Sequence, residues 1–471
     1  MKRSRAGRGK GQPVGYAKRL QTGHYKGRCG GAEDAISNEK LRTESKRLAQ
    51  MLRGAPIVVA HTGAGLSTAA GIPDFRGKDG VWTLEEQGQP LPDYEKCWDN
   101  AMPTLGHMAL VGLVNEGIVT AVISQNVDGL HLRSGIPREK LCELHGNLFM
   151  EVCSGCQREL RRTADVGGVG FKPTGRRCPH CSEGLVDVLL DWEDELRDYE
   201  QAVALSDRCR EPNGVSLCLG TSLQISPSKD LPAKADKMAI VNLQRTPKDA
   251  RAAVVVRAKI DAAMRCVMEE LSIPIPVYRR VETLVISHTS FRPSGKNDRW
   301  KWAIVVGDAA DGARCGFVES MGVSFPGTKL SEALVADPPF RVSRTTMSRR
   351  LTEGRGESRL EEGYEIDSGV RIEAKAGRAE EGVQSGVGVG ADFGVEVGVD
   401  VGVDVDASPE SGVGCGVGEF MTVVLALSFV APPGHTTPKP LTVEYRMDLA
   451  ASEGSQEVEV FLGEVDYNDT T

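Results

Sequence analysis

Long apolar runs are missing from this sequence of 471 residues. No run approaches the roughly 20 apolar residues needed to cross a bilayer, so we expect no membrane span and no membrane partner. An excess of positive charge is missing too, because the net charge is -8, which excludes a general attraction to nucleic acid. The basic first ten residues, MKRSRAGRGK, lack the apolar core of a secretory signal, and we expect the chain to stay in a reducing compartment.

The chain is longer than one hydrophobic core usually holds, so we expect more than one domain. Its composition divides it into four parts. Residues 1–35 are rich in Gly, Lys and Arg and are typical of a disordered arm. In residues 36–277, short apolar runs alternate with helical stretches, which predicts a doubly wound, parallel, Rossmann-like α/β sheet. Residues 278–352 and 419–471 contain strand-like segments without helices and predict a β-rich C-terminal domain. The Gly/Val/Asp/Glu tract at 353–418 is of low complexity and favours a disordered insertion over a repeat fold.

Polar residues follow each apolar run that predicts a strand of the parallel sheet. The runs lie at residues 57–60, 119–124, 215–219 and 238–243. The first three are followed by Gly63-Ala64-Gly65, Gln125-Asn126-Val127-Asp128 and Gly220-Thr221-Ser222, and the fourth ends in Asn242-Leu243-Gln244. Because ligands of open α/β sheets collect at the carboxyl ends of the strands, these residues predict one shared binding crevice.

The Gly63-Ala64-Gly65 segment after the first run indicates a nucleotide ligand. Glycines there let backbone N–H groups approach a pyrophosphate, and a following helix would add its positive end. A G-x-G alone is equally typical of a tight turn without a ligand. It also fails the dinucleotide fingerprint, since Thr68 stands where a third Gly or Ala is required.

His145, in Leu144-His145-Gly146, is the candidate base of the central region. An imidazole with a pKa near 6.5 can take a proton at neutral pH. The alternative is a buried histidine that serves only as a hydrogen-bond partner.

Two C-x-x-C pairs with 21 residues between them predict a structural zinc site in a small module at about 146–190. Four thiolates complete a tetrahedron and leave no position for water, so the metal would not be catalytic. The alternative is a pair of redox motifs. The ligands would be Cys153, Cys156, Cys178 and Cys181.

From about residue 40 to 277 the chain resembles the sirtuin family. The motifs occur in family order: G-A-G-x-S, G-I-P-D-F-R, S-Q-N-V-D-G-L-H, E-L-H-G, both C-x-x-C pairs, G-T-S-L and V-N-L-Q. The Leu190–Asp194 segment is similar to class IV, the sirtuin-6 type, and the long C-terminal extension to its plant and algal members. The chain departs from the family at Arg257-Ala258, where His-Gly is usual, and in its compact second C-x-x-C hairpin.

The resemblance implies an NAD-dependent protein-lysine deacylase. In the family's reaction nicotinamide leaves, the acyl oxygen attacks the ribose, and a base in the position of His145 deprotonates a ribose hydroxyl, giving O-acyl-ADP-ribose. Asn126 and Asp128 would hold the nicotinamide amide, and Trp192 would line the acyl tunnel. The implied cofactor contacts are Gly63, Ala64, Gly65, Thr68, Asp74, Phe75, Arg76, Trp82, Gln125, Asn126, Asp128, Gly220, Ser222, Asn242, Gln244 and Ile260.

The expected substrates are acylated histone tails or other nuclear proteins. The basic arm indicates a nuclear address, or else a solvated arm, and offers a contact for chromatin. Two other functions stay open: protein mono-ADP-ribosyl transfer, and NAD-sensing chromatin binding. A hydride-transferring dehydrogenase is disfavoured because the fingerprint fails.

Overall fold

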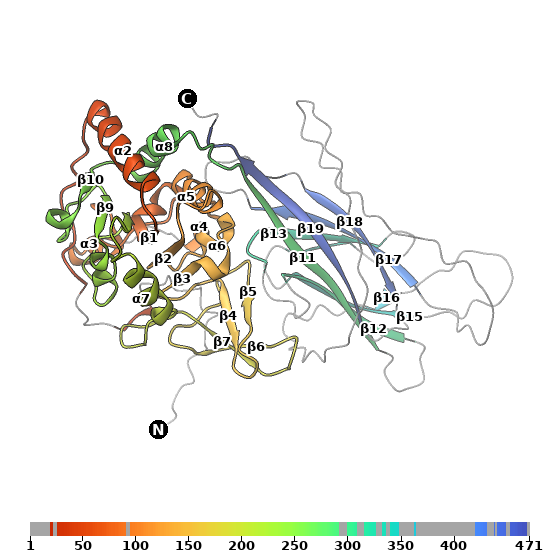
Figure 1. Cartoon of the computed structure of the whole chain (residues 1–471). Helices are drawn as coiled ribbons and strands as arrows, with labels where there is room; N and C mark the ends of the chain where they lie inside the picture. The colour runs from red at the N-terminus through yellow and green to blue at the C-terminus, as the bar shows by residue number, and fades with distance from the viewer. Residues whose placement is uncertain are drawn as a thin grey trace, which may run out of the picture. The chain divides into compact units, whose positions relative to one another are not determined.

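The computed structural model divides the chain into two compact units (Figure 1). One comprises Met1–Arg280, Pro432–His435 and Glu464–Thr471, and the other Val281–Ala431 and Thr436–Gly463. The structure describes residues 19–21, 26–90, 95–291, 299–308, 315–325, 332–335, 340–347, 362–363, 420–430, 438, 440–448 and 453–468. Most of the predicted basic arm, and the low-complexity tract apart from residues 362–363, lie outside these ranges.

The first unit is built on a six-stranded parallel sheet, which confirms the predicted fold class. Its strand order is β10-β9-β8-β1-β2-β3. The four predicted strands are β1 (Val58–Thr62), β2 (Ala121–Ser124), β8 (Val215–Leu219) and β9 (Lys237–Val241). The outer strands β3 (Leu141–Glu143) and β10 (Val254–Val256) have three residues each, too few to give a sequence signal.

Helices cover both faces of this sheet, because successive residues of a buried strand point to opposite sides. Val58 and Ala60 of β1 pack into the large core with α2 (Asn38–Arg53), α5 (Leu105–Asn115) and α8 (Ile260–Leu271). Ile57 and Val59 pack into a second core with α7 (Tyr199–Arg208). The shorter helices are α3 (Val81–Glu86), α4 (Glu95–Asn100) and α6 (Leu130–Ser134). No helix in the described ranges is long and apolar enough to cross a membrane.

A small antiparallel sheet lies between β3 and α7 in the chain, where the zinc module is expected. Its strand order is β5-β4-β7-β6. The strands are β4 (Met150–Cys153), β5 (Glu159–Arg161), β6 (Pro173–Arg177) and β7 (Gly184–Asp187).

The second unit is β-rich, as predicted, and consists of two sheets around a core of its own. The strand orders are β16-β15-β12-β11-β19 and β14-β13-β17-β18. The strands are β11 (Tyr278–Phe291), β12 (Arg299–Gly307), β13 (Val318–Ser324), β14 (Ala333–Val335), β15 (Phe340–Met347), β16 (Glu362–Gly363), β17 (Phe420–Phe429), β18 (Leu441–Asp448) and β19 (Glu453–Val465). Trp302 and Phe325, both buried, pack with ring centroids 5.6 Å apart between β12 and the end of β13.

Two boundaries differ from the sequence prediction. Residues 26–35, expected in the disordered arm, hydrogen-bond to the first unit: the Gly30 N–H donates to the Arg76 carbonyl at 3.1 Å. Residues 464–468, expected in the β-rich domain, also belong to the first unit. In both segments the partners are distant in sequence, so composition alone could not reveal them.

Candidate active site

A cavity of about 650 Å³ lies at the carboxyl ends of the parallel strands, as the strand pattern predicts. All predicted cofactor contacts except Asp128 line it, together with His145 and Trp192. They are Gly63, Ala64, Gly65, Thr68, Asp74, Phe75, Arg76, Trp82, Gln125, Asn126, Gly220, Ser222, Asn242, Gln244 and Ile260.

The glycines after β1 serve a different purpose from the one expected. The N–H groups of Gly63 and Gly65 donate to the carbonyls of Leu219 and Gly220 at 3.1 and 3.0 Å, so they do not point at a phosphate. A Cβ on Gly63 would lie 2.7 Å from the Thr221 Cα, which no real contact tolerates. These glycines therefore let two cavity loops touch.

The helix expected after this loop is also absent from the described residues. Two short 3₁₀ turns, Ala64–Leu66 and Thr68–Ala70, stand in its place. The predicted contact of this loop with a pyrophosphate stays a prediction, without the α-helix that would add its positive end.

His145 is held in the tautomer that a base requires. Its Nδ1 lies 2.9 Å from the Gln125 carbonyl oxygen, and because a carbonyl only accepts, Nδ1 carries the proton and Nε2 has a free lone pair. Burial lowers the pKa of His145 from 6.5 to about 4, with a smaller contribution from the nearby Arg76 guanidinium. The ring is neutral at pH 7 and can accept a proton through Nε2.

Asp128 is connected to the cavity through Ser67 and Asn126, and Asn126 lines the cavity. Its carboxylate accepts from the Ser67 hydroxyl at 2.6 Å and from the Leu130 N–H at 2.9 Å. The Asn126 amide N–H₂ donates to the same hydroxyl at 3.1 Å. Asp128 therefore orients Asn126 through Ser67, and its own contact with the nicotinamide amide stays a prediction.

The side-chain oxygen of Asn126 is buried and has no hydrogen-bond partner among the described residues. Such an orphaned acceptor is costly unless a ligand donates to it. A carboxamide N–H₂, such as that of nicotinamide, fits this position, and the arrangement is compatible with NAD.

Aromatic rings form another wall. The Trp82 ring lies 4.6 Å from that of Phe75 and stacks on Trp192 at 5.5 Å. The Arg76 guanidinium carbon stands 4.6 Å from the centroid of Trp82. Asp74, beside them, accepts from the Gly77 N–H at 2.8 Å, and burial raises the pKa of its carboxyl.

Arg257, a departure from the family pattern, holds the loop after β9. Its guanidinium donates to the carbonyls of Asn242 and Gln244 at 3.3 and 2.9 Å and pairs with Asp249. Glu33, which the sequence gives no reason to select, also lines the cavity and forms an isolated bridge with Gln244. No motif marks that segment.

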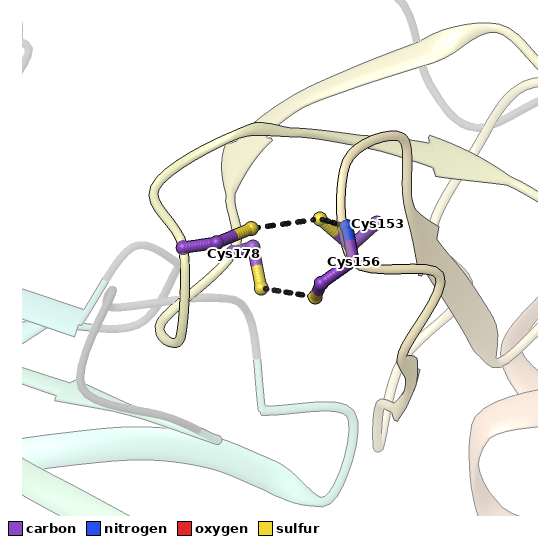
Figure 2. A group of neighbouring side chains, drawn as sticks. Cys153, Cys156 and Cys178 are labelled. Atoms are coloured by element: carbon purple, nitrogen blue, oxygen red, sulfur yellow. Dashed lines mark hydrogen bonds between the residues drawn. The ribbon is translucent and has the colours of Figure 1, made fainter.

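The four predicted zinc ligands come together, and their sulfur atoms lie within 4.8 Å of one another. Figure 2 shows thiols of the two hairpins facing each other. Cys153 Sγ lies 3.3 Å from Cys181 Sγ, and Cys156 Sγ lies 3.7 Å from Cys178 Sγ. Tetrahedral zinc with bonds of about 2.3 Å requires sulfur separations of about 3.8 Å. The cluster therefore fits a structural zinc ion with four sulfur ligands, and the exposed His180 is not part of it.

Comparison with known proteins decides the family. The Sir2 family profile matches residues 63–227. The NAD-dependent protein deacetylase SRT1 of Arabidopsis thaliana is 42% identical over 341 residues, which cover 71% of this chain and 72% of that protein. The chain belongs to the Sir2 family.

A relative of the Sirt6 type is similar over most of its own length. The NAD-dependent protein deacetylase Sirt6 of Drosophila melanogaster is 41% identical, over 56% of this Sir2 chain and 86% of that protein. A solved structure described as Sir2-p53 peptide-NAD+ is 29% identical, with a TM-score of 0.37, over 48% of this chain and 97% of that one. The predicted resemblance to sirtuins, class IV types included, is confirmed.

Proposed function

We propose that this Sir2-family chain is an NAD-dependent protein-lysine deacylase with His145 as its general base. The observation that carries the proposal is the hydrogen bond from His145 Nδ1 to the Gln125 carbonyl, which leaves Nε2 unprotonated at the cavity. The curated relatives, named as NAD-dependent protein deacetylases, support the same reaction.

When bound, NAD would supply an electrophilic ribose carbon with nicotinamide as its leaving group. Asn126, held by Ser67 and Asp128, orients the nicotinamide amide through its unpaired oxygen. His145 Nε2 takes the proton of a ribose hydroxyl, and the Gln125 carbonyl stabilises the resulting imidazolium. Trp192, stacked on Trp82, lines the apolar path of the acyl group.

The test is nicotinamide release from NAD in the presence of acetylated and long-chain-acylated lysine peptides, with deacylation followed by mass spectrometry. We expect His145→Ala to lose about 10²- to 10⁴-fold in rate, the usual contribution of a general base. His180→Ala, which changes an exposed ring outside the four thiols, is the matched control and should keep its rate. If no acyl peptide promotes nicotinamide release, the proposal fails. If label from NAD appears on protein while acyl groups stay, mono-ADP-ribosyl transfer replaces it.

The finer proposal is that the substrates are histone tails or other basic nuclear proteins. Support comes from the segment Asp191–Glu200 beside the cavity, which carries carboxylates at 191, 193, 194, 195, 198 and 200. Acidic groups at the mouth of a site attract a lysine flanked by Lys or Arg. We expect Glu195→Lys to raise the KM for a basic acyl peptide more than for a neutral one.

Nuclear localisation rests on the basic first ten residues. Residues 1–35 fused to a reporter should direct it to the nucleus. A reporter that stays evenly distributed would remove that basis.

A further inference from the structure

The C-terminal residues Glu464–Asn468 are part of the catalytic unit, although the β-rich unit separates them from it in the sequence. Val465 and Tyr467 pack against the large core of the parallel sheet. Glu464 pairs with Arg279 at 2.5 Å, at the points where the chain leaves and re-enters this unit.

Specific hydrogen bonds fix this segment. The Asn468 side chain pairs with the backbone of Ile275 in both directions: Nδ2 donates to the carbonyl at 2.8 Å, and Oδ1 accepts from the N–H at 3.2 Å. Arg265 of α8 donates to the Tyr467 carbonyl at 2.8 Å. The two hydrogen bonds between Asn468 and Ile275, together with the bond from the Arg265 guanidinium, fix the position and orientation of Tyr467.

The Tyr467 hydroxyl donates to the carbonyl of Pro103, in the turn that begins α5. The next residue, Thr104, caps α5, and its hydroxyl donates to the Leu66 carbonyl at 3.1 Å. Two residues further, the Gly106 N–H donates to the Asp261 carboxylate at 2.9 Å. Leu66 and Asp261 both line the cavity, so Tyr467 holds the element that joins two of its walls.

The Tyr467 ring is half-buried beside Asp261 at the start of α8. Burial, with the nearby Asp261 carboxylate, raises the pKa of the phenol, which therefore stays protonated and keeps its donor at neutral pH. A hydrogen bond of this kind is worth about 1 kcal/mol, which corresponds to about a fivefold change in an equilibrium constant.

We propose that Tyr467 is a positioning residue for the cofactor cavity. It acts through the Pro103–Gly106 turn, which braces Leu66 and Asp261. The link to NAD rests on the proposed function. The contacts from Tyr467 through the Pro103–Gly106 turn to Leu66 and Asp261, called the brace below, can be tested without NAD.

The experiment uses the full chain with Tyr467→Phe, which removes the hydroxyl and keeps the ring. We expect about a threefold to tenfold higher KM and Kd for NAD, with kcat at saturating NAD within about twofold of wild type. Hydrogen exchange should quicken in peptides covering residues 63–70 and 103–108. The matched control is Tyr445→Phe, which removes a buried phenol that bonds His288 at 2.6 Å in the β-rich unit. It should lower Tm and leave the NAD constants and both peptides unchanged.

A fall in Tm for Tyr467→Phe with unchanged NAD affinity and unchanged exchange in those peptides would reduce Tyr467 to a packing residue and overturn the inference. Wild-type protein that binds no NAD would contradict the proposed function instead. In that case faster exchange in the two peptides would still support the brace, and unchanged exchange would refute it.

Discussion

His145 is set up as a base by burial and by one backbone carbonyl, and each has a measurable consequence. Burial lowers its pKa to about 4, and the base works only when its ring is neutral. We therefore expect kcat/KM to stay level from pH 8 to 5 and to fall as pH drops through about 4. The measurement is the pH profile of nicotinamide release, with return to pH 7 as the control for unfolding. A midpoint near 6.5, the unperturbed value, would contradict the buried, carbonyl-bound ring.

At this scale the sequence was a good guide to residue identity and a poor guide to contacts. Polar residues after strands marked four of the segments that line the cavity, because the carboxyl ends of parallel strands must meet at one edge, and the family resemblance supplied other contacts such as Arg76 and Trp82. That argument could not separate Asn126, which faces the cavity, from Asp128, which lies behind it, because side-chain direction after a strand depends on the turn. Nor could it show that Arg257 bonds the Asn242 and Gln244 carbonyls.

The zinc module is joined to the catalytic loop by backbone contacts. The Leu190 N–H, three residues beyond β7, donates to the His145 carbonyl at 3.1 Å. A Cβ on Gly146 would lie 1.9 Å from the Val188 carbonyl oxygen, and Gly146 has a φ of 86°, so the fit allows only glycine.

We expect Cys178→Ser to lose zinc, to lower Tm and to reduce deacylation by more than about tenfold, because an open zinc site releases the strand that supports His145. Metal content, Tm and activity are measured together. Cys266→Ser, at a half-buried thiol outside the cluster, is the control and should retain all three. A variant without zinc that kept full activity would break the proposed link.

Elements with strong periodicity were predictable, and short ones were not. The helix at 38–53 and the four longer strands follow from their apolar patterns. The 3₁₀ turns after Gly63 carry no sequence signal of their own, since glycines followed by small residues do not separate a 3₁₀ turn from an α-helix. Strands of three residues, such as β3, carry no period at all.

On the scale of the whole molecule, the low-complexity tract remains a predicted insertion. We expect that replacing residues 364–419, between β16 and β17, with a short Gly/Ser linker leaves deacylation unchanged. Tm should stay equal or rise slightly, because each halving of a flexible loop lowers its closure cost by about 0.6 kcal/mol. Calorimetry measures the Tm, and the nicotinamide assay measures deacylation. A large loss of stability would show that the tract packs against a core.

The first and last strands of the β-rich unit, β11 and β19, carry a consequence for how such a chain can be remodelled. β11 and β19 are neighbours in one sheet, and Arg279 pairs with Glu464. The chain therefore leaves the first unit after residue 280 and finally returns to it at residue 464, and the Arg279–Glu464 ion pair joins these two points. We expect that a guest domain whose first and last strands pair can replace the β-rich unit, provided that residues 464–471 stay with the first unit.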